Sequence, residues 1–422
     1  MMEATNNDAI NAAVRMRVVR VVCACLVMIA IGFIYGWSIF SAPLKAEFQW
    51  DATALSFTFT VLMWMFVAGG IIGARISEVT SVRVTLIVGA ACIFLSFFLT
   101  TLLASAETPW IMYLTYGVLG GGGVGMCYTV TLSAGVSWFP DRTGAVTGVM
   151  LLCYSFSTMV LSSVAAWLFA TVGWRAAFVG LSAVMAIIVA AMSFIVRRPT
   201  EAEMAALPRA QKKDDDGKQQ AQQATRDYKT GEMLKTPAFW TYIVWMFLMS
   251  CIGLGLIGSN NNVALETGMG TVLAVTAVGV FSVCNGLGRL FNGFIYDILG
   301  TTKMMGLVAA LHTAGCLIII AALVTQSTPI LFAGFIIGAL GIGGVSIVGS
   351  GFMATAFGSK YYAKNLSMLN VTLVPAAFCG PLIMSSSVSA TQSYYIGIIV
   401  LVAAGIVGFL CMFATRAAMK KL

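Results

Sequence analysis

Residues 85–104 read TLIVGAACIFLSFFLTTLLA, an apolar run without a charged side chain. A helix rises 1.5 Å per residue, so a run of about 20 residues matches the ~30 Å hydrocarbon core of a bilayer. Apolar and polar residues do not alternate in it, as they would in a strand of a membrane barrel. The stretch predicts a membrane-spanning helix, and eleven other stretches of the chain have a similar character.

The composition of the whole chain agrees with a lipid environment. Of the 422 residues, 59% are hydrophobic and 9% are charged, and the mean hydropathy is +0.93. Soluble domains carry about 25% charged residues. In lipid, every backbone polar group needs an internal partner, which leaves helices and closed barrels as spanning structures. We therefore predict an all-α membrane protein.

Twelve spanning helices are expected, in two groups of six. The first group covers 18–40, 54–74, 85–104, 111–138, 144–172 and 176–195, and the second covers 239–261, 272–295, 304–324, 330–357, 366–386 and 394–414. The polar stretch between the groups has the composition of a disordered or partly helical linker. The expected organisation is an N-terminal six-helix bundle (1–196), a cytoplasmic linker (197–236) and a C-terminal six-helix bundle (237–422), related by pseudo-two-fold symmetry.

Lysine and arginine are distributed unevenly over the loops. With the N-terminus inside, the outer loops hold only Lys45 and Arg175, and the other loop cations face the cytoplasm. The positive-inside rule then predicts a multi-pass protein of the plasma (inner) membrane with both termini cytoplasmic. The same bias accounts for the net charge of +8, so no nucleic-acid partner is implied.

Two loops share a pattern of small, acidic and basic residues. GFIYDILGTTK (293–303) follows the eighth expected helix, and ARISEVTSVR (74–83) follows the second. The pattern resembles the loop between helices 2 and 3 of the major facilitator superfamily, repeated in the second half. That resemblance implies gating or conformational roles, with two ordinary charged turns as the alternative. The residues concerned are Gly293, Asp297, Gly300, Lys303, Glu78 and Arg83.

The interior of the expected spans is almost free of charge. Every carboxylate falls in a loop or at a helix end, and Arg289 is the cation placed inside a span. A cation at such depth costs ~2.5–3.5 kcal/mol or more. A substrate carboxylate would offset this cost, and Asn285, four residues earlier on the same helix face, could donate to it as well. The alternative is a structural arginine that bonds to backbone carbonyls or reaches the interface.

Three further motifs resemble the oxalate/formate antiporter family of this superfamily, which is similar to the monocarboxylate transporters. They are WFPDRTGAVTG (138–148), GEMLKTPAFW (231–240) and FGSKYYAKN (357–365). The resemblance implies that a substrate carboxylate meets Arg289 and that aromatic residues of the N-terminal half close the site. The matching aromatic residues are Tyr35, Tyr128 and Tyr154, for which core packing is the alternative.

The chain departs from the oxalate-transporter pattern in its second half. Leu373 stands where that subgroup has a second cation, and Ile342 and Ser346 stand where it has aromatic residues. One buried cation suits one carboxylate better than two. The residues therefore favour monocarboxylates such as pyruvate, lactate or formate, and oxalate:formate (dicarboxylate) exchange is the alternative.

The sequence thus predicts a secondary active transporter of small organic anions that works by alternating access. The expected partners are the substrate, the lipid bilayer and protons as a coupling ion, and the expected functional form is a monomer. The proton could travel on the substrate's own carboxylate or on His312, the single histidine, whereas an anion exchanger needs no proton carrier.

Other classes of protein find little support in the residues. No His/Asp/Glu cluster or paired intramembrane carboxylates suggest an enzyme, and no GxxxxGK[ST] motif suggests a primary pump. The ten cysteines have no metal-ligand spacing, so neither a metal nor a cofactor is expected. A membrane sensor built on a transporter fold would need a signalling motif in 197–235, which shows none.

Overall fold

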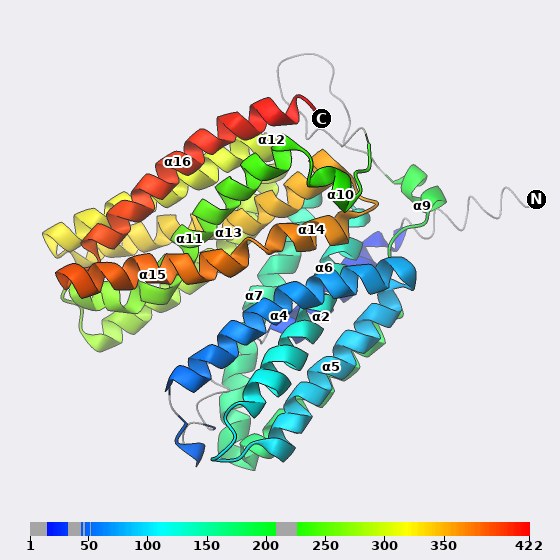
Figure 1. Ribbon diagram of the computed structural model, residues 1–422, viewed down its shortest axis with the longest axis horizontal. Coiled ribbons are helices and arrows are strands. Elements are labelled where there is room, and N and C mark those ends of the chain that lie inside the picture. Colours follow the sequence, from blue (N-terminus) through cyan, green and yellow to red (C-terminus); the bar gives the residue numbers. More distant parts are fainter. Residues whose placement is uncertain (1–14, 33–43, 45–46, 51, 208–225) are drawn as a thin grey trace, which may run out of the picture. The chain divides into compact units, whose positions relative to one another are not determined.

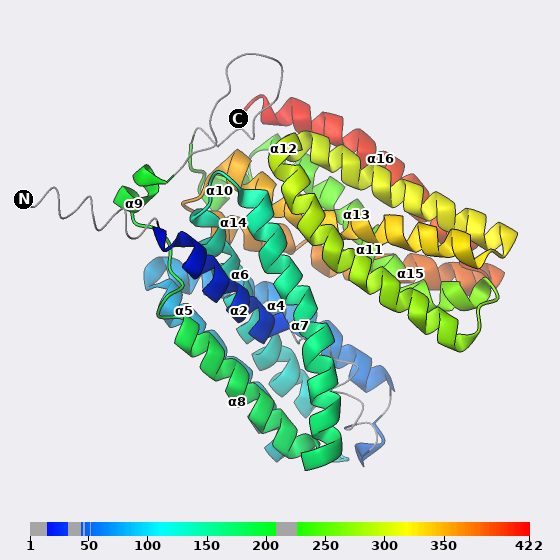
Figure 2. The same ribbon diagram turned by 180° about the vertical axis from the view of Figure 1, so that it is seen from behind.

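The computed structural model describes residues 15–32, 44, 47–50, 52–207 and 226–422, and their regular secondary structure is helical throughout (Figures 1 and 2). The chain forms two compact units. The first unit comprises 1–141 and 149–209, and the second comprises 142–148 and 210–422. The short segment 142–148 therefore belongs with a part of the chain that begins about 60 residues after it, at residue 210.

The first unit is built from long helices that pack along one another. Its helices are α2 (Arg17–Ile31), α4 (Ala52–Val79), α5 (Val82–Leu103), η2 (Tyr113–Gly120), α6 (Gly121–Ser137), α7 (Thr143–Val172), α8 (Trp174–Met192) and α9 (Glu201–Ala206). Helix α6 packs against α4 and α5, and α5 also packs against α8. The glycines of α6 permit a close approach, because a Cβ at Gly125 would overlap the carbonyl oxygen of Phe66 in α4.

The second unit holds the remaining helices. They are α10 (Thr230–Met233), α11 (Pro237–Glu266), α12 (Thr271–Thr325), α13 (Thr328–Phe357), α14 (Tyr362–Asn370), α15 (Leu373–Thr391) and α16 (Tyr395–Met419). Helix α12 is two helices joined at Gly300, whose φ of 70° and ψ of 174° are not helical. This positive φ favours glycine. The break separates the eighth and ninth expected helices.

The expected helix 366–386 is divided in the structure. Helix α14 ends at Asn370, and α15 starts at Leu373. Pro375 explains the division, because a proline has no N–H to give to the carbonyl of Val371 one turn earlier. Leu373 is consequently the first residue of α15, and its side chain is half-buried.

Eight helices within the described residues are long and apolar enough to cross a membrane. They cover 57–79, 82–103, 174–192, 237–266, 272–325, 328–357, 362–391 and 395–419. The span 272–325 contains the break at Gly300, so it corresponds to two expected helices. Large apolar side chains such as Ile187 (66% exposed) and Phe378 (68%) cover the outside of these helices. Such surfaces suit contact with lipid rather than with water.

Candidate functional site

Arg289 and Asn285 lie one turn apart on the first part of α12. Arg289 precedes the Gly300 break by 11 residues (300 − 289), which is about 16 Å along a helix. Both side chains are half-buried, and the Nε atom of Arg289 and the Oδ1 atom of Asn285 are shielded from solvent. The arginine therefore lies within a spanning helix, as its position in the sequence indicated.

Backbone packing fixes Arg289 on two sides. A Cβ at Gly343 of α13 would lie 2.6 Å from the backbone nitrogen of Arg289, and one at Gly148 of α7 would lie 2.7 Å from its carbonyl oxygen. Both distances are shorter than real Cβ contacts. The main chain at Arg289 is thus held between α13 and the start of α7, at places where only glycine fits.

The aromatic candidates belong to the first unit. The rings of Tyr128 (α6) and Tyr154 (α7) lie 5.2 Å apart, and Tyr128 lies 5.2 Å from Phe66. Tyr154 is only 2% exposed, whereas Tyr128 is half-buried. Tyr128 therefore offers more surface to a ligand than Tyr154 does. Tyr35 lies outside the described residues.

Asp297 binds the start of α7. Its Oδ1 accepts a hydrogen bond from the backbone N–H of Gly144 at 2.8 Å, and its Oδ2 accepts one from Ala145 at 2.8 Å. The first N–H groups of a helix have no partner within the helix and carry partial positive charge, so a carboxylate is well placed there. Gly293, one turn before Asp297, adds to the contact, because a Cβ there would lie 2.5 Å from the carbonyl oxygen of Gly144.

The other residues of the repeated loop pattern have separate surroundings. Lys303 is exposed just beyond the break at Gly300. In the first unit, the Oε2 atom of Glu78 lies 3.4 Å from an Arg75 nitrogen, and the Arg83 guanidinium lies 4.5 Å from the centre of the Phe194 ring. The two copies of the pattern thus make different contacts, and their gating roles stay a prediction.

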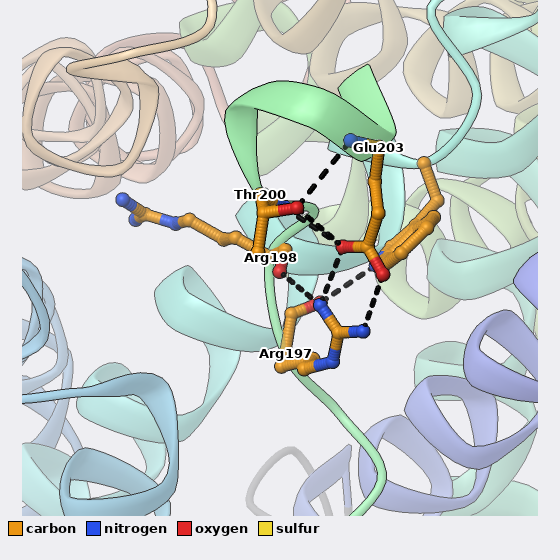
Figure 3. Close-up of polar contacts among 5 residues, drawn as sticks. Arg197, Arg198, Thr200 and Glu203 are labelled. Atoms are coloured by element: carbon orange, nitrogen blue, oxygen red, sulfur yellow. Dashed lines mark hydrogen bonds and ion pairs between the residues drawn. The ribbon is translucent and has the colours of Figure 1, made fainter. Parts of the chain in front are cut away.

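A charged cluster anchors α9 to the first unit (Figure 3). Arg197 donates to both carboxylate oxygens of Glu203, at 2.7 Å each, and Thr200 and Glu203 form a reciprocal cap at the start of α9. The indole of Trp138 donates to the carbonyl oxygen of Arg197 at 2.7 Å. Hydrogen bonding to Arg197 lowers the pKa of Glu203 to about 2. Arg198 points away from the cluster, and burial lowers its pKa.

Two further acids, which the sequence did not single out, lie at matching places in the two halves of the chain. Glu47 follows the first expected helix and binds the start of α8, where it accepts from the Trp174 indole and lies 2.8 Å from an Arg175 nitrogen. Glu266 ends the seventh expected helix and accepts from the backbone N–H of Tyr394 at 2.9 Å, at the start of α16. An acid after the first and the seventh helix was the signal available in the sequence.

His312 lies in the second part of α12 and is fully buried. Its Nδ1 atom lies 2.8 Å from the carbonyl oxygen of Val308, an acceptor, so Nδ1 carries a hydrogen. The Nε2 atom is buried, with no hydrogen-bond partner among the described residues. Within the same part of the chain, no group of three or more His, Cys, Asp or Glu side chains could hold a metal ion.

These features define a class of protein. A chain whose described residues form long helices with apolar outer surfaces is a multi-pass membrane protein. Residues 22–277 match the Major Facilitator Superfamily, which is more than half of the chain. The chain belongs to the Major Facilitator Superfamily, whose members include secondary transporters.

Two relatives within this superfamily show which transporters the sequence resembles. The chain is 25% identical over 367 residues to the uncharacterized MFS-type transporter YhjX of Escherichia coli (strain K12), which covers 86% of this chain and 87% of that protein. It is 26% identical over 294 residues to the oxalate:formate antiporter of Oxalobacter formigenes, which covers 69% of this chain and 66% of that protein. The predicted resemblance to the oxalate/formate antiporter family is confirmed as a distant one.

Solved structures confirm the predicted fold. The proton:xylose symporter XylE, bound to 6-bromo-6-deoxy-D-glucose, has a TM-score of 0.68 at 13% identity and covers 94% of this chain and 95% of its own. The transporter FucP in the outward conformation has a TM-score of 0.67 at 13% identity. The match covers 94% of this chain and 99% of the FucP chain. At this identity the likeness shows the fold alone, an all-α membrane fold that implies twelve spanning helices.

Proposed function

We propose that the protein is a secondary active transporter of small monocarboxylate anions that works by alternating access. The position of Arg289 carries the proposal. Within the described residues it is the cation in the interior of a spanning helix, and the acids there lie at helix ends or near the Gly300 break. A guanidinium in such surroundings forms its strongest contact with a carboxylate, through two parallel hydrogen bonds.

The neighbours of Arg289 support a site for one anionic group. Asn285 is one turn away and carries a polar amide that could bind the same carboxylate or a substituent next to it. Tyr128 and Tyr154 form an aromatic pair in the first unit. We assign them, with Tyr35, to the wall that meets the rest of the substrate, with the half-buried Tyr128 as the member with most surface to offer.

The residues of the second unit favour a monocarboxylate over a dicarboxylate. Leu373 and Ile342 are apolar and half-buried, so neither could bind a second carboxylate. Exchange of oxalate for formate is the second candidate, because one relative is an oxalate:formate antiporter. We place the protein in the plasma (inner) membrane as a functional monomer with both termini cytoplasmic, coupled either to a proton or to a counter-anion.

Counterflow in proteoliposomes tests this proposal. Vesicles loaded with unlabelled lactate, pyruvate, formate, acetate or oxalate are diluted into a labelled monocarboxylate, with Arg289→Ala and Arg416→Ala measured in parallel. Arg416 is exposed in the last turn of α16, so its variant removes a cation without touching the site. Strong monocarboxylate exchange that is lost only in Arg289→Ala supports the proposal. Undiminished exchange in Arg289→Ala would overturn it, and robust oxalate exchange would establish the second candidate.

A further inference from the structure

Three buried hydroxyl groups form a continuous chain inside the second unit. Thr147 in the first turns of α7, Ser350 in α13 and Tyr362 at the start of α14 are each no more than 2% exposed. The Oγ1 atom of Thr147 lies 3.0 Å from the Oγ atom of Ser350, which is also hydrogen-bonded to the Tyr362 hydroxyl. Thr147 in turn donates to the carbonyl oxygen of Thr143 at 2.7 Å.

The geometry fixes the direction of every bond in this chain. A hydroxyl has one hydrogen to donate, and the hydrogen of Thr147 goes to the carbonyl of Thr143. Thr147 therefore accepts from Ser350, and the hydrogen of Ser350 is used. Tyr362 must then donate to Ser350. Each hydroxyl donates once, so the chain is fully satisfied, and such chains strengthen their own members.

The hydroxyl chain contacts the segment of α7 that belongs to the second unit. Residues 142–148 belong to the second unit, and α7 continues in the first unit from Val149. Gly148, the last residue of this segment, lies against the carbonyl oxygen of Arg289. Release of the first turn of α7 from the other helices of the second unit would remove the contact that Gly148 makes with Arg289.

We propose that Thr147, Ser350 and Tyr362 form an uncharged lock that holds the first turn of α7 in the second unit. Ser350 is then a positioning residue for Arg289, which it reaches through Thr147 and Gly148. The lock acts beside the charged contact of Asp297 with Gly144, so the first turn of α7 has two ties of different chemistry. The role of the lock in transport rests on the proposed alternating access, but its existence as a local tie does not.

Hydrogen–deuterium exchange measured by mass spectrometry on the full-length protein in nanodiscs tests the lock without any substrate. Thr147→Val keeps the shape of the side chain and removes the hydroxyl, and Thr147→Ser keeps the hydroxyl as the matched control. We expect Thr147→Val and Ser350→Ala to speed the exchange of amides 144–150 about tenfold, which corresponds to ~1.4 kcal/mol. Thr147→Ser should change it less than twofold, and peptides within α8 should keep their rates.

Two results would overturn the inference. One is unchanged exchange at 144–150 in Thr147→Val, and the other is an equal rise in every peptide, which would indicate general destabilisation. If Ser350→Ala does not fold, Tyr362→Phe removes a single hydroxyl of the Thr147–Ser350–Tyr362 chain and should give a smaller local rise in exchange at 144–150. Because no substrate is present, failure of the lock and failure of the proposed monocarboxylate transport are separate outcomes.

Discussion

The Asp297 carboxylate accepts the backbone N–H of Gly144 at 2.8 Å, although 153 residues separate the two along the chain. This contact makes the start of α7 part of the second unit, while the rest of the helix belongs to the first. The acid of the repeated loop pattern therefore has a defined structural partner, the buried first turn of a helix.

Replacing Asp297 should weaken this contact in steps. Asn keeps one acceptor oxygen and presents an NH2 group to the second N–H, so one of two bonds is lost, and Ala loses both. We expect a destabilisation of about 1–2 kcal/mol for Asp297→Asn and more for Asp297→Ala. Thermal unfolding in detergent checks the order, with Asp297→Glu as the variant that keeps the charge. An alanine variant as stable as the wild type would show that the contact contributes nothing.

The glycine contact at Arg289 gives a steric prediction. A methyl group at position 148 would lie 2.7 Å from the Arg289 carbonyl oxygen, so Gly148→Ala forces the first turn of α7 away from α12. Overpacking of this kind costs ~1–3 kcal/mol. We expect a lower unfolding temperature and slower counterflow. Gly279→Ala is the control, since a Cβ there meets nothing within 4 Å and should be neutral or stabilising.

Much of the fold could be predicted because lipid leaves few alternatives. The expected helix 85–104 agrees with α5 at Val82–Leu103, since a long apolar run must be helical to satisfy its own backbone. The break at Gly300 was also predictable, because a glycine between two apolar runs marks a turn. The division of α14 from α15 was missed, although Pro375 was the available signal.

The candidate site was predictable only in part. Arg289 could be identified from the sequence, because a cation inside an apolar run is energetically costly unless an anion or another polar partner binds it. The hydrogen-bonded hydroxyls of Thr147, Ser350 and Tyr362 could not be predicted from the sequence. Small hydroxyl residues are common in spanning helices, and the helix backbone can itself accept their hydrogen bonds. Which hydroxyls meet depends on how helices 200 residues apart in sequence pack, and no local pattern encodes that packing.

The Arg197–Glu203 pair predicts a pH-dependent contribution to stability. The pKa of Glu203 falls from 4.5 in the unfolded chain to about 2 in the folded one, chiefly through its hydrogen bond with Arg197. A lowered pKa stabilises the folded form above about pH 4.5, and this gain is lost as the pH falls towards 2. Because Arg197 is partly exposed, we expect Glu203→Gln to cost no more than about 1–3 kcal/mol at pH 7.

Unfolding curves of the wild type and Glu203→Gln between pH 3 and pH 7 measure this effect. The difference between the two proteins should be full at pH 7 and should shrink below pH 4.5. Glu201→Gln, a change at an exposed position in the same first turn of α9, is the control and should have little effect. A difference that stays constant over the whole range would contradict the pKa-based explanation.

His312 should not carry the coupling proton. Its Nδ1–H is bound to the Val308 carbonyl, and charging the ring would leave a second N–H buried with no partner among the described residues. We expect His312→Phe to transport with an unchanged pH profile, with a moderate loss of stability from the altered packing. Uptake between pH 5 and pH 8 measures the profile. A variant whose pH dependence disappears would restore His312 as the proton carrier.

Leu373 should limit the range of substrates if its side chain faces the bound anion. Its half-buried side chain begins α15, where a lysine would add a second cation to the second unit. If one cation limits the site to one carboxylate, Leu373→Lys should gain oxalate exchange and lose affinity for lactate, whose methyl group needs an apolar neighbour. Leu373→Met, similar in volume and uncharged, should behave as the wild type.

Competition of oxalate against a labelled monocarboxylate in counterflow measures the preference of the transporter for oxalate over that monocarboxylate. A second charged pairing contributes about 1.5–3 kcal/mol, so the preference for oxalate should rise by roughly ten- to a hundredfold in Leu373→Lys. The double variant Arg289→Ala, Leu373→Lys should exchange neither anion well, because the lysine introduced at position 373 supplies neither the cation at position 289 that binds a single carboxylate nor the pair of cations that oxalate needs. An unchanged preference in Leu373→Lys would place residue 373 away from the substrate and remove the structural ground for favouring monocarboxylates.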